Sequence, residues 1–121
     1  MTIVAKKTIL RVEHELIGGN RMRRSAEDAV RSLGIFATYV GYFPLVDLVE
    51  TLSEGGAYER QLWVNTARKY GISVKMLDAR IRRLMVCAQK NAPQRWQHWF
   101  GRERVSLKSF LLKLAAHTEP G

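Results

Sequence analysis

The stretch WVNTARKYGISVKMLDARIRR, at Trp63–Arg83, predicts two short helices joined by a tight turn. Gly71 can adopt the positive φ angle that a sharp turn between helices needs, and Ala67 is small enough to let the two helices approach each other. Ser73 is placed to cap the second helix. Three apolar residues after the turn can face back onto the first helix: Ile72, Leu77 and Ile81. This is the apolar skeleton of a helix-turn-helix.

The outer side of the second predicted helix is polar and basic. At about 100° per residue, the residues that fall opposite Leu77 include Lys75, Asp78, Ala79 and Arg82. A helix that turns Lys75 and Arg82 outward, with a small Ala79 between them, can enter a major groove and place a guanidinium against a guanine edge. The alternative is an ordinary surface helix whose basic face is solvated.

Charge is unevenly distributed along the chain. The 121 residues are enough for one domain, and their net charge is +9. Residues 59–90, which contain the predicted helix-turn-helix, carry eight basic and two acidic groups, whereas residues 25–58 carry one basic and five acidic groups. We therefore expect a molecule with one positive and one negative side. Such polarity suits a partner with a phosphate backbone, and double-stranded DNA is the partner we predict.

Other classes of function have little support in the sequence. The single cysteine, Cys87, cannot form an internal disulfide and is expected to be a small core residue. The three histidines, His14, His98 and His117, have no partners at the spacing of a metal site or a catalytic triad, so no enzyme, metal or cofactor is expected. No apolar run approaches the roughly 18 residues of a membrane span. We expect a cytoplasmic protein.

Hydrophobic periodicity predicts an all-α fold, a compact bundle of about six helices that contains the helix-turn-helix. Residues 1–24 are expected to form an N-terminal extension, irregular or with short strands at 2–4 and 8–12, and residues 25–121 the helical domain. The extension ends in Arg21, Arg23 and Arg24, which form either a phosphate-binding arm or a solvated tail. The expected helices are residues 25–33, 44–54, 59–69, 74–90, 93–100 and 106–116. The segment 35–41 is expected to be a buried connection.

From Ser25 onward the chain resembles the DNA-binding effector domain of the sporulation response regulator family, stage 0 sporulation protein A. The resemblance is carried by LGIFATYVGYFPL with its Gly41-Tyr42 pair, by the turn ARKYG at residues 67–71 and by LDARIRR at residues 77–83. Phe100-Gly101 and an aromatic-containing last helix complete it. The match covers roughly four-fifths of the chain and implies a six-helix fold that binds DNA.

The resemblance also implies residue roles. In that family an acidic residue and two arginines of the recognition helix contact bases, and these positions correspond to Asp78, Ala79 and Arg82. Ala79 departs from the family pattern, which puts the family's DNA sequence in doubt for this chain. The family's regulator also carries a receiver domain, which 24 residues cannot form, so phosphorylation-controlled dimerisation is not expected.

These observations together predict a sequence-specific DNA-binding protein, a bacterial transcriptional regulator. The expected base contacts are Lys75, Asp78, Ala79 and Arg82, and the expected phosphate contacts are Arg68, Lys69, Ser73, Arg80 and Arg83. A homodimer on DNA, with the last helix as the contact, and RNA polymerase are further expected partners. The alternative is a protein-interaction module that has the same fold but does not bind a specific DNA sequence. Ala79, which stands where the family has a base-contacting arginine, is the feature that favours this alternative.

Overall fold

The chain folds into helices joined by short loops. The computed structural model describes residues 20–118, and within that range it contains no strand. The helices are α2 (Asn20–Ser32), α3 (Tyr42–Ser53), α4 (Arg60–Lys69), α5 (Val74–Asn91), α6 (Pro93–Phe100) and α7 (Leu107–Ala116). The prediction of an all-α bundle of about six helices is therefore confirmed. The strands expected at 2–4 and 8–12 lie outside the described residues.

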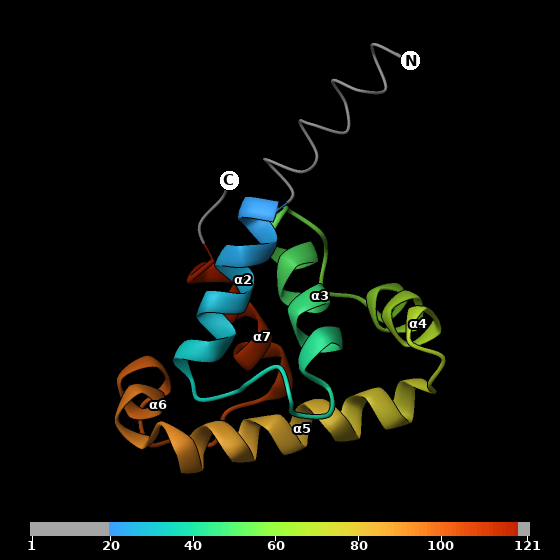
Figure 1. Cartoon of the computed structure of the whole chain (residues 1–121). Coiled ribbons are helices and arrows are strands. Elements are labelled where there is room, and N and C mark those ends of the chain that lie inside the picture. Colours follow the sequence, from blue (N-terminus) through green and yellow to red (C-terminus); the bar gives the residue numbers. More distant parts are fainter. Residues whose placement is uncertain (1–19, 119–121) are drawn as a thin grey trace.

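The longest helix, α5, forms the base of the molecule. Figure 1 shows α5 running beneath α2, α3 and α7, with α4 next to its N-terminal end and α6 next to its C-terminal end. The first turn of α2 lies on the side of the molecule away from α5. As a result, one long side of α5 has no other described helix beneath it in this view.

The core is built around α3, which contacts α2, α4, α5 and α7. Its predicted apolar stripe is buried as expected, and this stripe comprises Leu45, Leu48, Val49 and Leu52. Val46 is also fully buried, because helices on several sides of α3 leave it little solvent-facing surface. The helix begins at Tyr42, two residues before the predicted start at Pro44.

Helix α2 starts earlier than the sequence predicted. It begins at Asn20, so Ser25 lies within the helix and is not its N-cap, and the helical part of the chain extends before residue 25. The reason is an apolar stripe at i, i+4 and i+8, Met22, Ala26 and Val30, which is buried against the core. Neither alternative given for the basic cluster, a phosphate-binding arm or a solvated tail, describes Arg23, because its guanidinium contacts Asp47 and Glu50 on α3.

Aromatic packing closes the end of the bundle at α6 and α7. The ring of Trp96, on α6, lies 4.3 Å from that of Phe100 and 5.8 Å from that of Phe110 on α7, measured between centroids. Trp99 stacks on His117 at 3.8 Å with the two rings parallel. Trp96 and Phe110 belong to the core, and the partly buried Trp99 and Phe100 pack against it.

The connection between α2 and α3 is only partly buried. Ile35 is fully buried, but Phe36 is 45% exposed and Val40 is 68% exposed, and Ala37 and Thr38 are exposed as well. The expectation of a buried segment 35–41 is therefore wrong at these four residues. Val40 lines a hollow with Met76 and Arg80 of α5, whereas the ring of Phe36 packs edge-on against that of Tyr39, with 5.6 Å between the centroids. Cys87 is half-buried with a free thiol.

Candidate nucleic-acid interface

The turn between α4 and α5 has the hydrogen bonds of a Schellman motif. The amide of Gly71 donates to the carbonyl of Arg68 at 3.1 Å, and the amide of Ile72 donates to the carbonyl of Ala67 at 3.0 Å. Gly71 has φ +66°, in the left-handed region that favours glycine. Ala67 is 2% exposed, as its predicted position between the helices requires. The predicted helix-turn-helix geometry is therefore present in residues 60–91.

Gly71→Ala is expected to lower the free energy of unfolding by about 1 kcal/mol, because an L side chain is strained at this φ angle. A Cβ at this position would meet no other atom within 4 Å, so the backbone strain acts alone. Urea unfolding measures the change. Gly71→Asn is the matched control and should lose less, because asparagine tolerates the left-handed region. Equal losses in the two variants would contradict this account.

The second helix of the pair is well anchored at its start. The Ser73 hydroxyl accepts a hydrogen bond from the amide of Met76 at 3.0 Å, which confirms the predicted N-cap. The residues of α5 that face the core are those expected from the helical period: Leu77, Ile81, Leu84, Met85 and Ala88. The rotation of α5 about its axis is thereby fixed.

The opposite side of α5 is open to solvent. Its exposed residues are Lys75, Ala79, Arg82, Arg83, Val86 and Lys90. Among residues 22–118, Lys75, Arg83 and Lys90 form no ion pair with an acidic group, and neither does Arg68 in the last turn of α4. These four cations are therefore available to an anionic partner as far as the described part of the chain is concerned.

Asp78 and Arg82 form an ion pair along the outer side of α5. The Nε of Arg82 lies 2.5 Å from the Oδ1 of Asp78, one helical turn away. This contact engages the Nε edge of the guanidinium and restricts its direction, while the two terminal nitrogens make no hydrogen bond within the described residues. The carboxylate of Asp78 can thus orient Arg82.

A buried carboxylate on α3 holds the C-terminal end of α4. Asp47 accepts hydrogen bonds from the guanidinium of Arg23, from the hydroxyl of Tyr70 at 2.5 Å and from the ammonium of Lys69 at 2.8 Å. Lys69, a predicted phosphate contact, is therefore ion-paired within the protein, although its side chain is still largely exposed. Sequence reasoning missed Asp47, because its partners lie 22 to 24 residues away along the chain.

The charge state of this cluster follows from its contacts. Burial by itself would raise the pKa of Asp47, but hydrogen bonds from Lys69, Tyr70 and Arg23 outweigh burial and hold that pKa below its ordinary value. Burial, followed by the bond to Asp47, raises the pKa of Tyr70 to about 12. Near neutral pH the Asp47 carboxylate is therefore ionised and the Tyr70 hydroxyl is a donor.

Arg80 is not on the outer side of α5. It is half-buried, and a Cβ added to Gly41 would lie 3.2 Å from the Cβ of Arg80, so the turn at Gly41 sits close over the start of this side chain. Arg80 lines a hollow of about 350 Å³ together with Val40, Met76 and Arg83. Among the predicted phosphate contacts, Arg80 therefore projects to the flank of α5 that faces the 35–41 segment.

The structure brings two further arginines to the outer side of α5. Arg102 and Arg104, in the loop between α6 and α7, line a hollow of about 530 Å³ with Arg82 and Val86. Sequence reasoning did not select them, although the net charge of residues 91–121, with five basic and two acidic groups, was a signal. Glu103 lies in the same hollow and reduces the local positive charge.

The described part of the chain contains neither a cluster of metal ligands nor a helix that could span a membrane. Among those residues, histidine, cysteine and carboxylate side chains do not gather in a group of three or more that could hold a metal ion. Within the same range, every helix is too short or too polar to cross a membrane.

Comparisons with protein-family models, with curated proteins and with solved structures give no match to this chain. The resemblance to the sporulation regulator family, noted from the sequence, therefore remains a prediction.

Proposed function

We propose that this protein is a transcriptional regulator that binds double-stranded DNA in a sequence-specific manner, with α5 in the major groove. The observation that carries the proposal is the open side of α5, which presents Lys75, Ala79 and Arg82 in a helix-turn-helix whose orientation is fixed by core packing. The net positive charge of residues 59–90 and the sequence resemblance point the same way.

Each group on this side has a role in the proposed complex. The terminal nitrogens of Arg82 donate to the O6 and N7 atoms of a guanine, while Asp78 holds its Nε. Ala79, small and apolar, allows close approach and can contact a thymine methyl group. Phosphates on either side are bound by the exposed cations Arg68, Arg83, Arg102 and Arg104.

Selection of binding sites from a pool of random duplexes tests the proposal, with the affinity of the purified protein for the enriched duplex measured by fluorescence anisotropy. We expect one short motif to be enriched and to bind more tightly than a scrambled duplex of the same composition. Equal affinity for both duplexes would contradict sequence reading.

Binding should weaken steeply with salt, because phosphate contacts release counterions. The four arginines proposed to bind phosphates have no acidic partner among the described residues: Arg68, Arg83, Arg102 and Arg104. About four phosphate contacts predict a slope of about −3.6 in log K against log salt, or roughly a 150-fold loss between 50 and 200 mM salt. Anisotropy titrations over this range give the slope. A slope near zero would exclude a phosphate-binding surface.

A second copy of the chain is part of the proposal, because one recognition helix reads only a few base pairs. The sequence placed the contact on α7, but the large apolar residues of α7 face the core: Leu107, Phe110, Leu111 and Leu114. Leu112, at 41% exposed, is the large apolar side chain that α7 turns outward. Dimerisation through α7 would therefore bury little apolar surface, and pairing is expected only on DNA.

The alternative function, a protein-interaction module, is favoured by one feature. Val40 and Met76 are exposed next to Ala79, Arg80 and Arg83 around the 350 Å³ hollow. An acidic partner with apolar side chains would fit this combination. The selection experiment separates the two functions, since an interaction module enriches no DNA motif.

A further inference from the structure

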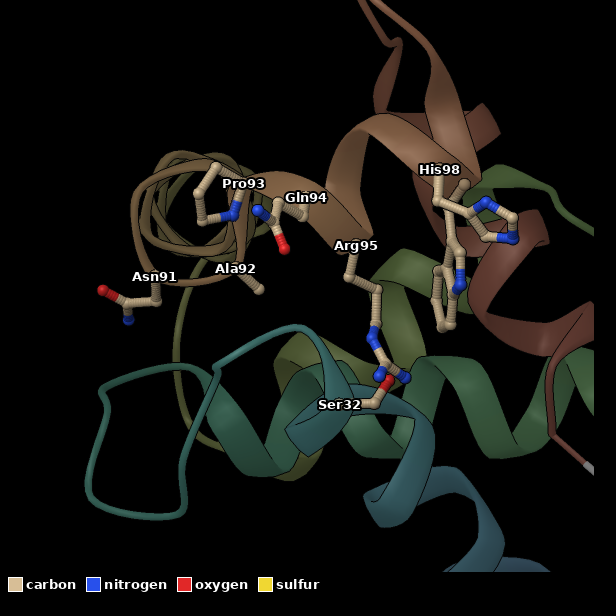
Figure 2. A pocket seen from close by; sticks show the side chains of 8 residues that line it. Ser32, Asn91, Ala92, Pro93, Gln94, Arg95 and His98 are labelled. Atoms are coloured by element: carbon tan, nitrogen blue, oxygen red, sulfur yellow. The ribbon is translucent and has the colours of Figure 1, made fainter.

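A hollow different from the two described above lies away from the outer side of α5. It is formed by the C-terminal end of α2, the C-terminal end of α5 and helix α6. Its volume is about 820 Å³, and its lining includes Ser32, Asn91, Arg95, His98 and Trp99. Figure 2 shows the Arg95 side chain reaching from α6 toward Ser32 at the end of α2. An adjoining hollow of about 340 Å³ shares Arg95 and Trp99 with it. We refer to the two together as the α2–α6 hollow.

The α2–α6 hollow has an excess of positive charge. Arg95 forms no ion pair within residues 22–118, and the imidazole rings of His98 and His117 line the same hollow. Asp28 is the carboxylate that lines the hollow, and it is already 2.7 Å from the guanidinium of Arg31. The positive charge around Arg95 is therefore not balanced by a free carboxylate in this lining.

The environment of His117 also indicates an excess of positive charge in the α2–α6 hollow. Its ring is stacked on Trp99, and its pKa is lowered first by burial and then by the nearby charges of Lys113, His98 and Arg95. The positive charge that α6 and α7 bring to this end of the molecule thus disfavours the protonated form of the His117 ring. An anion bound among them would remove this repulsion.

We propose that the α2–α6 hollow binds the phosphate group of a small molecule or a free phosphate ion. The planar guanidinium of Arg95, which reaches into the hollow toward Ser32, suits two oxygens of a phosphate. The stacked Trp99 and His117 rings form a wall of the site. This proposal does not depend on DNA binding, because none of the residues used here lies on the outer side of α5.

Proton NMR of the histidine ring signals tests the site in the whole protein. The probes are inorganic phosphate and glucose 6-phosphate, with glucose as the uncharged control. We expect saturable shifts of the His117 signals with one or both phosphate probes and none with glucose. The pKa of His117 should rise when the site is filled, because a bound anion favours the charged ring.

Arg95→Ala should weaken phosphate binding roughly 10- to 100-fold, as expected for loss of charge-assisted hydrogen bonds. Its fold should persist, because Arg95 is exposed and forms no hydrogen bond in the described part of the chain, and circular dichroism verifies this. Arg60→Ala is the matched control, an exposed arginine without an ion pair in the described residues. It belongs to α4, which Figure 1 shows beside the N-terminal end of α5, whereas α6 lies at the C-terminal end. Arg60→Ala should leave phosphate binding unchanged.

Three results would overturn the proposal. They are shifts that grow linearly without saturation, equal affinity in Arg95→Ala and the parent, and shifts of His117 by a DNA duplex but by neither phosphate probe. Arg82→Ala distinguishes this site from the proposed function, because it should retain phosphate binding while it loses DNA specificity. Phosphate binding in a protein that does not bind DNA would leave the site proposal intact.

Discussion

Asp47→Ala is expected to lower the free energy of unfolding by about 2–4 kcal/mol. The substitution leaves Arg23 and Tyr70 without the carboxylate that accepts their hydrogen bonds, and breaking one side of a buried ion pair costs about 3–5 kcal/mol. Our range is lower because Arg23 and Lys69 keep contact with water, with side chains 28% and 63% exposed. Urea unfolding followed by circular dichroism measures the loss.

Asp28→Ala is the matched control for this prediction. Asp28 also pairs with an arginine, Arg31, but its side chain is 65% exposed and the pair lies along the surface of α2. Its loss should cost only a few tenths of a kcal/mol, as for other exposed pairs along a helix. If the two variants were equally stable, Asp47 would not anchor the end of α4.

The contribution of Asp47 should also depend on pH. Its folded pKa lies below the ordinary value of 3.8, so its stabilisation is present above about pH 4 and is lost as the pH falls through the folded pKa. In Asp47→Ala this part of the acid sensitivity disappears. The difference in stability between the parent and the variant should therefore shrink as the pH is lowered from neutral to below 4.

The parts of the fold that the sequence predicted well are those with local signals. The bounds of α4 and α5 agree with prediction to within one residue, because Gly71, Ser73 and the apolar period all lie within the segment itself. The predicted start of α2 was wrong because Ser25 was taken as the beginning of the helix, whereas burial of Met22 continues the helix back to Asn20.

The candidate site was predictable only in part, for a related reason. Helical period places Lys75, Ala79 and Arg82 on the open side of α5, and they are exposed there. The helical period of a sequence cannot show which side chains are contacted by other segments of the folded chain. The turn at Gly41 covers the start of Arg80, and Asp47 on α3 engages Lys69, so two of the expected phosphate contacts have neighbours that only the folded chain brings to them.

Arg82→Ala should weaken binding to the selected duplex by about 1–3 kcal/mol, or roughly 5- to 150-fold, with a much smaller change on random DNA. The reason is the loss of up to two hydrogen bonds to one base edge from an exposed guanidinium that Asp78 orients. Anisotropy titrations with selected and scrambled duplexes at one salt concentration measure both affinities.

Arg68→Ala is the matched control, because Arg68 is an exposed arginine at the turn end of α4. It should weaken binding to every duplex about equally and reduce the salt slope by about one, as loss of one phosphate contact does. A uniform loss in both variants would mean that α5 lies along the backbone and does not read the groove.

Asp78→Ala then decides how the carboxylate acts. If Asp78 acts by orienting Arg82, the Asp78→Ala variant should lose part of the sequence specificity of the parent protein. Adding Asp78→Ala to an Arg82→Ala variant should cause no further loss, because the guanidinium that Asp78 orients is already absent. If it accepts a hydrogen bond from a cytosine amino group, the two losses should add, and preference should relax at a second base pair. The 2.5 Å contact between the Asp78 carboxylate and Arg82 Nε leads us to expect the first outcome. Additive losses would contradict it and would place Asp78 directly against a base.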